Sequence, residues 1–111
     1  MKNLKIYQNA LALIAEIYDL TRATKLVKDY SLIDQLRRAA ISVLANIAEG
    51  YCRSTKQFKN YLQIASGSTN EVVALLQVIT LVYDIETTRL QESFQILGRQ
   101  INSFSRTLTD N

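Results

Sequence analysis

Three cations stand close together in the middle of this 111-residue sequence, and tyrosines flank them on both sides. Arg53, Lys56 and Lys59 follow one another at three-residue intervals between Tyr51 and Tyr61. Cationic side chains bind phosphate groups, and aromatic rings stack on unpaired bases. The combination is therefore suited to a surface for single-stranded RNA or DNA. The alternative interpretation is an ordinary solvated helix end, whose lysines contact only water.

A second, smaller basic group lies earlier in the chain, at Lys25 and Lys28. These lysines would extend the first group if the fold brought the two segments together. The chain as a whole has 13 Lys and Arg against 10 Asp and Glu, a net charge of +3. This mild excess permits an anionic partner but does not require one.

A further set of polar residues interrupts two otherwise apolar segments. Its members are Arg37, Arg38, Asn46, Glu49, Ser66 and Glu71. Charged groups near a core persist when they are paired, so we expect a structural polar network at the middle of the molecule. The pairs expected within it are Arg37 with Glu71 and Arg38 with Glu49. A small-molecule site at the same place is the alternative.

The sequence offers little for catalysis. It contains no histidine and one cysteine, so a Cys–His nucleophile and the commonest metal ligand are both missing. No glycine-rich phosphate loop and no Glu-x-x-His pair occurs. Glu49 and Glu71 could act as acid and base, but nothing completes a constellation around them. We therefore expect no enzymatic activity, no metal and no cofactor.

The elements that must position these residues are helices. The chain has no proline and only three glycines, and its apolar residues recur at helical spacing. We predict one domain, residues 1–111, with helices over about 3–23, 31–50, 55–83 and 88–108. Predicted N-caps are Ser31, Ser54 and Thr88, and Gly50 is the predicted break after the second helix.

The apolar spacing also predicts how the helices pack. The third and fourth predicted helices carry apolar residues at alternating intervals of four and three, which is typical of an antiparallel up-down-up-down bundle. In the first helix, Tyr7, Leu11, Ile14 and Tyr18 form the predicted inward stripe, with Ala10, Leu13 and Ile17 beside them. The second helix carries one such stripe at Ile33, Leu36, Ala40, Val43 and Ile47. This helix is apolar around most of its circumference, so we expect another subunit to cover part of it.

The compartment is predicted from two features. The single cysteine, Cys52, excludes an internal disulfide and fits a reducing cytoplasm. Polar residues interrupt the first 20 residues, which are too polar for a signal peptide and too short to span a bilayer. We therefore expect a cytoplasmic protein with no membrane association.

Three strings in the sequence are distinctive together: QLRRAAISV at 35–43, NIAEG at 46–50, and ASGS at 65–68 with Glu71 after it. They resemble the four-helix-bundle family of proteins encoded in intervening sequences of 23S ribosomal RNA genes. The resemblance implies a ring-shaped homo-oligomer, typically a homopentamer, in which the motif residues are structural. More distantly, the chain is similar to accessory variability proteins of diversity-generating retroelements, which bind a reverse transcriptase and nucleic acid.

These observations lead to three hypotheses about function. The first is a non-enzymatic oligomeric scaffold that binds RNA or DNA through a basic surface. The second is an adaptor that holds a partner protein, such as a reverse transcriptase. The third is a binder of small molecules at the polar middle of the bundle. No sequence feature identifies which nucleic acid or which protein partner would be bound.

Overall fold

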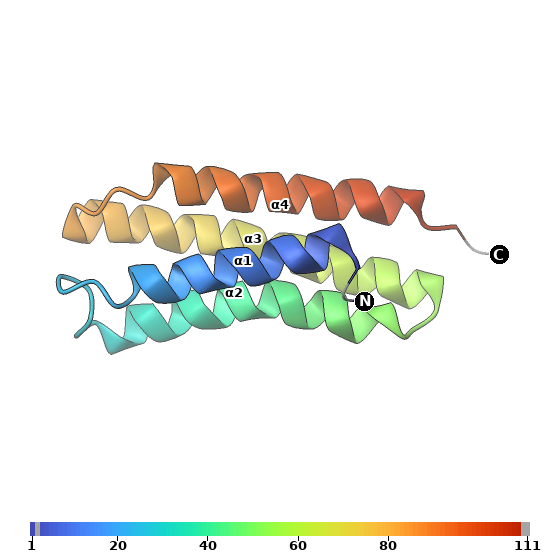
Figure 1. The fold of residues 1–111 in the computed structure, drawn as a ribbon, viewed down its shortest axis with the longest axis horizontal. Helices are drawn as coiled ribbons and strands as arrows, with labels where there is room; N and C mark the ends of the chain where they lie inside the picture. The colour runs from blue at the N-terminus through green and yellow to red at the C-terminus, as the bar shows by residue number, and fades with distance from the viewer. Residues whose placement is uncertain (2, 110–111) are drawn as a thin grey trace.

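A computed structural model describes residues 1 and 3–109 of the chain. It contains four helices, α1 (Lys5–Leu20), α2 (Tyr30–Tyr51), α3 (Thr55–Tyr83) and α4 (Thr88–Thr107), and no strand among the described residues. The helices run alternately up and down along a body with extents of 51 × 20 × 20 Å (Figure 1). The all-α fold with four helices in this order is the one that the sequence predicts.

The core lies where the predicted stripes of three helices meet. Leu62 and Leu76 of α3 have no exposed surface, and neither has Phe94 of α4. On α2, Val43 and Ile47 are fully buried as well. Full burial of side chains this large contributes about 1.5–3 kcal/mol each to folding. The alternating four-and-three spacing therefore identifies the inward faces of α2, α3 and α4 correctly.

The predicted inward stripe of α1 is wrong. The buried residues of α1 are Ile6, Ala10, Leu13 and Ile17, whereas Leu11 is 46% exposed. Both stripes have the same spacing, and they differ by about one residue of helical rotation. The observed stripe leaves Tyr7 and Tyr18 only partly buried, which avoids placing in the core hydroxyls that would need hydrogen-bond partners there. Tyr18 lies at the side of α1, where the guanidinium of Arg37 covers its ring at 4.1 Å.

Two of the predicted N-caps lie one or two residues away from the observed ones. Asp29, not Ser31, caps α2: its carboxylate accepts a hydrogen bond from the Leu32 amide at 3.2 Å. The same carboxylate accepts the hydroxyl of Tyr83 at 2.5 Å, and this hydrogen bond raises the pKa of Tyr83. An aspartate that serves both a helix end and a distant helix is the stronger cap here.

The starts of α3 and α4 are fixed by side-chain hydroxyls. Ser54 caps α3 as predicted, because its hydroxyl accepts from the Gln57 amide at 3.3 Å. Thr87, not Thr88, precedes α4. The buried hydroxyl of Thr87 donates to the carbonyl of Leu76 at 3.1 Å and so attaches the start of α4 to α3.

Gly50 does not break α2, which continues to Tyr51, and no glycine in the described residues has a positive φ. Gly50 is buried against α3 instead. A Cβ placed on it would lie 2.8 Å from both Phe58 Cδ1 and Tyr61 Cβ. The absence of a side chain therefore allows the last turn of α2 to approach the first turns of α3 closely.

This close approach makes a stability prediction. Gly50→Ala is expected to destabilise the fold by about 1–3 kcal/mol, because the Tyr61 Cβ is fixed to its backbone and the helices must separate. Gly67→Ala is the matched control: a Cβ added at Gly67 would have no atom within 4 Å, so this change should add up to about 1 kcal/mol through helix propensity. Denaturant unfolding at one fixed protein concentration measures both. Equal gains for the two variants would contradict the packing role of Gly50.

Candidate nucleic-acid interface

The two predicted basic groups lie at opposite ends of the bundle. The α2–α3 turn lies at one end, near the N-terminus, and the α1–α2 and α3–α4 loops lie at the other (Figure 1). Lys25 and Lys28 belong to the α1–α2 loop, whereas Arg53, Lys56 and Lys59 belong to the α2–α3 turn and the start of α3. The fold therefore does not join the two groups, and Lys25 and Lys28 cannot extend the first surface.

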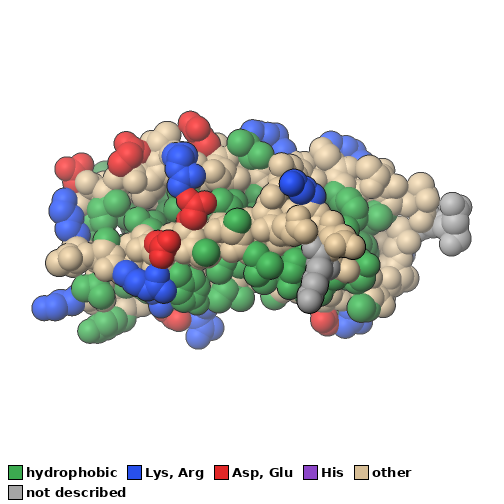
Figure 2. Space-filling view, viewed as in Figure 1, with side chains coloured by type: hydrophobic (Ala, Val, Ile, Leu, Met, Phe, Trp, Pro, Cys, Tyr) green, Lys and Arg blue, Asp and Glu red, His purple; other side chains and the backbone are tan. Residues whose placement is uncertain are grey.

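Charge is instead segregated along the bundle. We call the half that contains the α2–α3 turn the basic end, formed by residues 3–11, 41–70 and 97–109. It holds one acid, Glu49, and six cations: Lys5, Arg53, Lys56, Lys59, Arg99 and Arg106. The remaining described residues hold six cations and eight acids. On the face shown in Figure 2, most acidic side chains accordingly lie in the half opposite the basic end.

The positive charge of Arg53 is partly neutralised by a neighbouring carboxylate. Its Nη2 donates to a carboxylate oxygen of Glu49 at 2.5 Å, one turn earlier on the chain. This hydrogen bond raises the pKa of Arg53, and its guanidinium lies 5.3 Å from the ring centre of Tyr61. Tyr51 is partly exposed, but its ring packs edge-on against Phe58. Arg53 and Tyr51 are therefore held by their own neighbours in the chain.

Lys56 and Lys59 have no ion pair with any described residue. Lys59 lines a cavity of about 340 Å³ between α3 and α4, together with Asn60, Gln63, Asn102, Ser105 and Arg106. We call this cavity the amide groove. All of its lining residues are polar, and none is acidic. A cation from each helix stands in its wall, so it presents positive charge from both sides.

The three amides in the amide groove make no side-chain hydrogen bond with another described residue. They are Asn60 and Gln63 on α3 and Asn102 on α4, and all three are exposed. Each amide offers two donors and an acceptor, which is the chemistry that reads the edge of a base. Flanking cations bind phosphates. The amide groove thus has both kinds of group that an unpaired nucleotide requires.

Reasoning from sequence missed Arg99, Arg106 and Asn102, because these residues lie about 40 positions after Lys59. Only the packing of α4 on α3 brings them together. A usable signal was present, however. No acid occurs between Gly50 and Asn70, nor between Ser93 and Thr109. Two acid-free segments at facing ends of adjacent antiparallel helices predict a basic surface.

The expected ion pairs of the polar network are wrong. Arg37 Nε donates to the hydroxyl of Thr21 at 2.9 Å, and Arg38 Nε pairs with Asp34, one turn earlier, at 2.9 Å. Glu49 pairs with Arg53 as described above. Glu71 is exposed and has no ion pair with any described residue. For Arg38 and Glu49, the observed partners lie one helical turn away and cost less conformational entropy than partners on another helix.

A neutral polar network does join α2 and α3. The hydroxyls of Ser42 and Ser68 lie 2.9 Å apart, and the Asn46 amide nitrogen donates to the carbonyl of Ser42 at 2.8 Å. Ser66 lies outside this network: its backbone carbonyl accepts the hydroxyl of Thr69 at 2.6 Å within α3. A cavity of about 600 Å³ lies between α1 and α4, and none of the residues of this network lines it. The network therefore satisfies its own polar groups across the α2–α3 contact.

A model of a known protein family matches nearly the whole chain. The model of the family described as 23S rRNA-intervening sequence protein matches residues 2–110. No curated protein matches the chain. The matched region covers all four helices, including the motifs at 35–43, 46–50 and 65–68. The chain therefore belongs to the family of 23S rRNA-intervening sequence proteins.

Proposed function

We propose that this chain is a non-enzymatic scaffold that binds RNA or DNA through its basic end. The observation that carries the proposal is the segregation of charge, with six cations and one acid in one half of the bundle. Within that half, the amide groove adds free amides between Lys59 and Arg106. Phosphate contacts would provide the affinity, and the amides would contact unpaired bases.

The proposal includes assembly, supported by a second stripe on α3. This outer stripe consists of Ile64, Glu71, Leu75, Val78 and Val82, which follow one another at intervals of seven, four, three and four residues. Val82 is 61% exposed, and the neighbouring Leu81 is 84% exposed. By length and hydropathy alone, α3 is apolar enough to cross a membrane. Only 39% of its most apolar window is buried in the bundle, so much of this apolar helix is exposed in the single chain. An apolar stripe of coiled-coil spacing is suited to cover by another helix.

We infer that copies of the same chain cover the outer stripe in a ring-shaped homo-oligomer, a pentamer by analogy with the family resemblance, in the cytoplasm. In a cyclic ring of parallel bundles, the basic ends would all lie on one face. Several weak phosphate contacts on one face act together through avidity, because the second contact is made at a high effective concentration. The scaffold would thus gain affinity for nucleic acid that a single chain lacks.

The salt dependence of binding tests this function. We expect labelled single-stranded RNA to bind at low salt and to dissociate steeply as salt rises, with a log–log slope of about −2 if three cations per chain contact phosphates. Fluorescence anisotropy over a range of salt concentrations measures the slope. Absence of binding at the lowest salt, for both RNA and single-stranded DNA, would refute the proposed function.

A further inference from the structure

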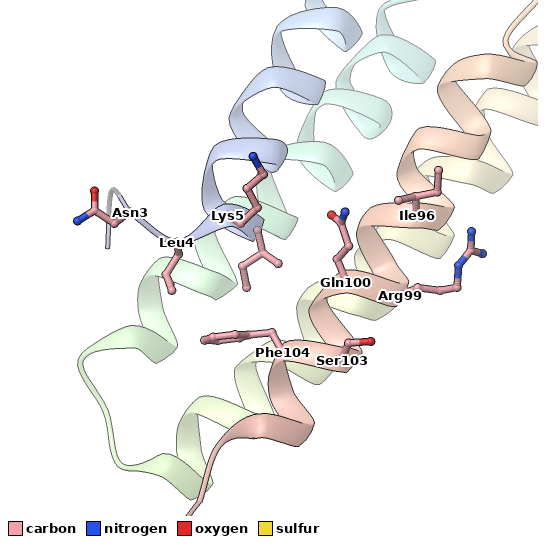
Figure 3. Close-up of a pocket in the computed structure, with 9 residues that line it drawn as sticks. Asn3, Leu4, Lys5, Ile96, Arg99, Gln100, Ser103 and Phe104 are labelled. Atoms are coloured by element: carbon pink, nitrogen blue, oxygen red, sulfur yellow. The ribbon is translucent and has the colours of Figure 1, made fainter.

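A second groove runs between α1 and α4, outside the amide groove. Its main part is a cavity of about 600 Å³ lined by Asn3, Leu4, Lys5, Ile6, Ile96, Arg99, Gln100, Ser103 and Phe104 (Figure 3). A smaller cavity of about 200 Å³ shares Ile96 and Gln100 with it and continues toward Ser93. We call the two together the α1–α4 groove. From Ser93 to Phe104 it follows about 16 Å of α4, at about 1.5 Å per residue.

The groove exists because α1 and α4 meet over the least extensive of the four interhelix contacts. Two exposed polar links join these helices: the Asn9 amide donates to the Gln100 oxygen at 2.9 Å, and Arg89 pairs with Glu16. The Asn9–Gln100 hydrogen bond lies where the two cavities meet, and the main cavity with its apolar floor lies beyond it, toward Leu4 and Phe104. Ile96, which lines both cavities, is 46% exposed although it stands next to core residues.

The floor and the rim of the groove differ in chemistry. Leu4, Ile6, Ile96 and Phe104 supply an apolar floor, and Phe104 is only partly buried although it packs against Phe58 in the core. Figure 3 shows Lys5 on α1 and Arg99 on α4, on opposite sides of the opening. No acid lines either cavity, and neither cation has an ion pair with a described residue. The groove therefore complements an apolar stripe with negative flanks.

We propose that the α1–α4 groove docks an acidic amphipathic helix of a partner protein. Apolar side chains at i, i+3 or i+4, and i+7 of the incoming helix span about 10 Å, which the groove accommodates. Carboxylates on the two flanks of that helix reach Lys5 and Arg99. The docked helix lies beside α1 and α4 as a fifth helix and covers Ile96. This inference goes beyond nucleic-acid binding, because it concerns a protein ligand and a groove separate from the amide groove; Lys5 and Arg99 on its rim also belong to the basic end.

A pair of synthetic peptides tests the proposal on the full chain. Both carry leucines at i, i+3, i+7 and i+10; one has glutamates on its flanks and the other has lysines at the same positions. We expect the acidic peptide to bind, by fluorescence anisotropy, and to shift the methyl resonances of Ile6 and Ile96. The lysine peptide should bind at least tenfold more weakly, because Lys5 and Arg99 repel it.

Two variants define the site. Ile96→Glu should lower the affinity for the acidic peptide at least tenfold, because it places a carboxylate on the apolar floor. Leu11→Glu is the matched control: Leu11 is also 46% exposed but lines neither cavity, so binding should be unchanged. Lys5→Glu with Arg99→Glu should reverse the preference between the two peptides. Circular dichroism verifies that each variant retains its helices.

Four outcomes would overturn the proposal. The first is no binding of the acidic peptide at millimolar concentration, and the second is equal binding of the two peptides. The third is a change in the oligomeric mass of Ile96→Glu, because the groove would then be a contact between copies of this chain. The fourth is a pair of results: the wild type binds no peptide, and Ile96→Glu loses RNA binding. That pair would assign the groove to nucleic acid. A wild type that binds peptide but ignores RNA would leave this inference intact and refute the nucleic-acid proposal alone.

Discussion

Lys59→Glu combined with Arg106→Glu is expected to weaken binding of single-stranded RNA by about 100-fold at low salt. Each reversal removes one phosphate contact and adds a repulsive charge at the wall of the amide groove. About 1.4 kcal/mol for each reversal corresponds to a tenfold loss. The salt slope should also become shallower, because fewer phosphates are neutralised. Anisotropy titrations of wild type and variant at matched salt measure both effects.

The matched control for this prediction is Lys25→Glu with Lys28→Glu. It changes the net charge by the same amount, but it acts at the end of the bundle opposite the basic end (Figure 1). Its effect should be small and should vanish at physiological salt, where charges more than about 8 Å apart are largely screened. If the control weakens RNA binding as much as the groove variant does, binding depends on net charge and not on the amide groove.

Val78→Glu with Val82→Glu is expected to convert the assembled protein into single chains. In an assembly these residues of the outer stripe would be buried, and an unpaired buried carboxylate costs several kcal/mol. Within one bundle both side chains are exposed, so the helices themselves should be unaffected. Light scattering measures the mass, and circular dichroism measures the helical content.

Leu11→Glu serves as the control for assembly, because Leu11 is exposed on α1, away from the outer stripe. Its mass in solution should equal that of the wild type. A variant at Val78 and Val82 that keeps the wild-type mass would place the interface elsewhere. A wild type that is itself a single chain would refute the proposed ring and leave the bundle unchanged.

How far the fold could be predicted depends on how unique each local pattern is. In α3, eight residues from Phe58 to Tyr83 follow one another at alternating sequence intervals of four and three. No other stripe on this helix is as apolar along its whole length, and this one predicts the buried face correctly. In α1 two adjacent stripes have the same spacing, and the observed one leaves Tyr7 and Tyr18 only partly buried, with the guanidinium of Arg37 over the ring of Tyr18. Cap positions depend similarly on distant groups, as Asp29 shows by bonding to Tyr83.

The candidate site could be predicted only where it is local in sequence. Arg53, Lys56 and Lys59 lie within two helical turns, so their proximity follows from spacing alone. Arg106 and Asn102 join Lys59 only after α4 has packed on α3, with Gly98 allowing close approach to Thr69. The expected ion pairs were wrong because local partners compete with distant ones. Partners within one helix, such as Asp34 for Arg38, are always available and compete with partners on another helix.

The unequal charge of the two ends gives this molecule an electric dipole along an axis 51 Å long. A polyanion at a distance therefore exerts a torque on the chain before any contact is made, and it turns the α2–α3 turn toward itself. Encounters that begin in the correct orientation raise the association rate, and this advantage declines as the ionic strength rises. Exchanging the positions of an acid and a cation between the ends would slow association at unchanged net charge.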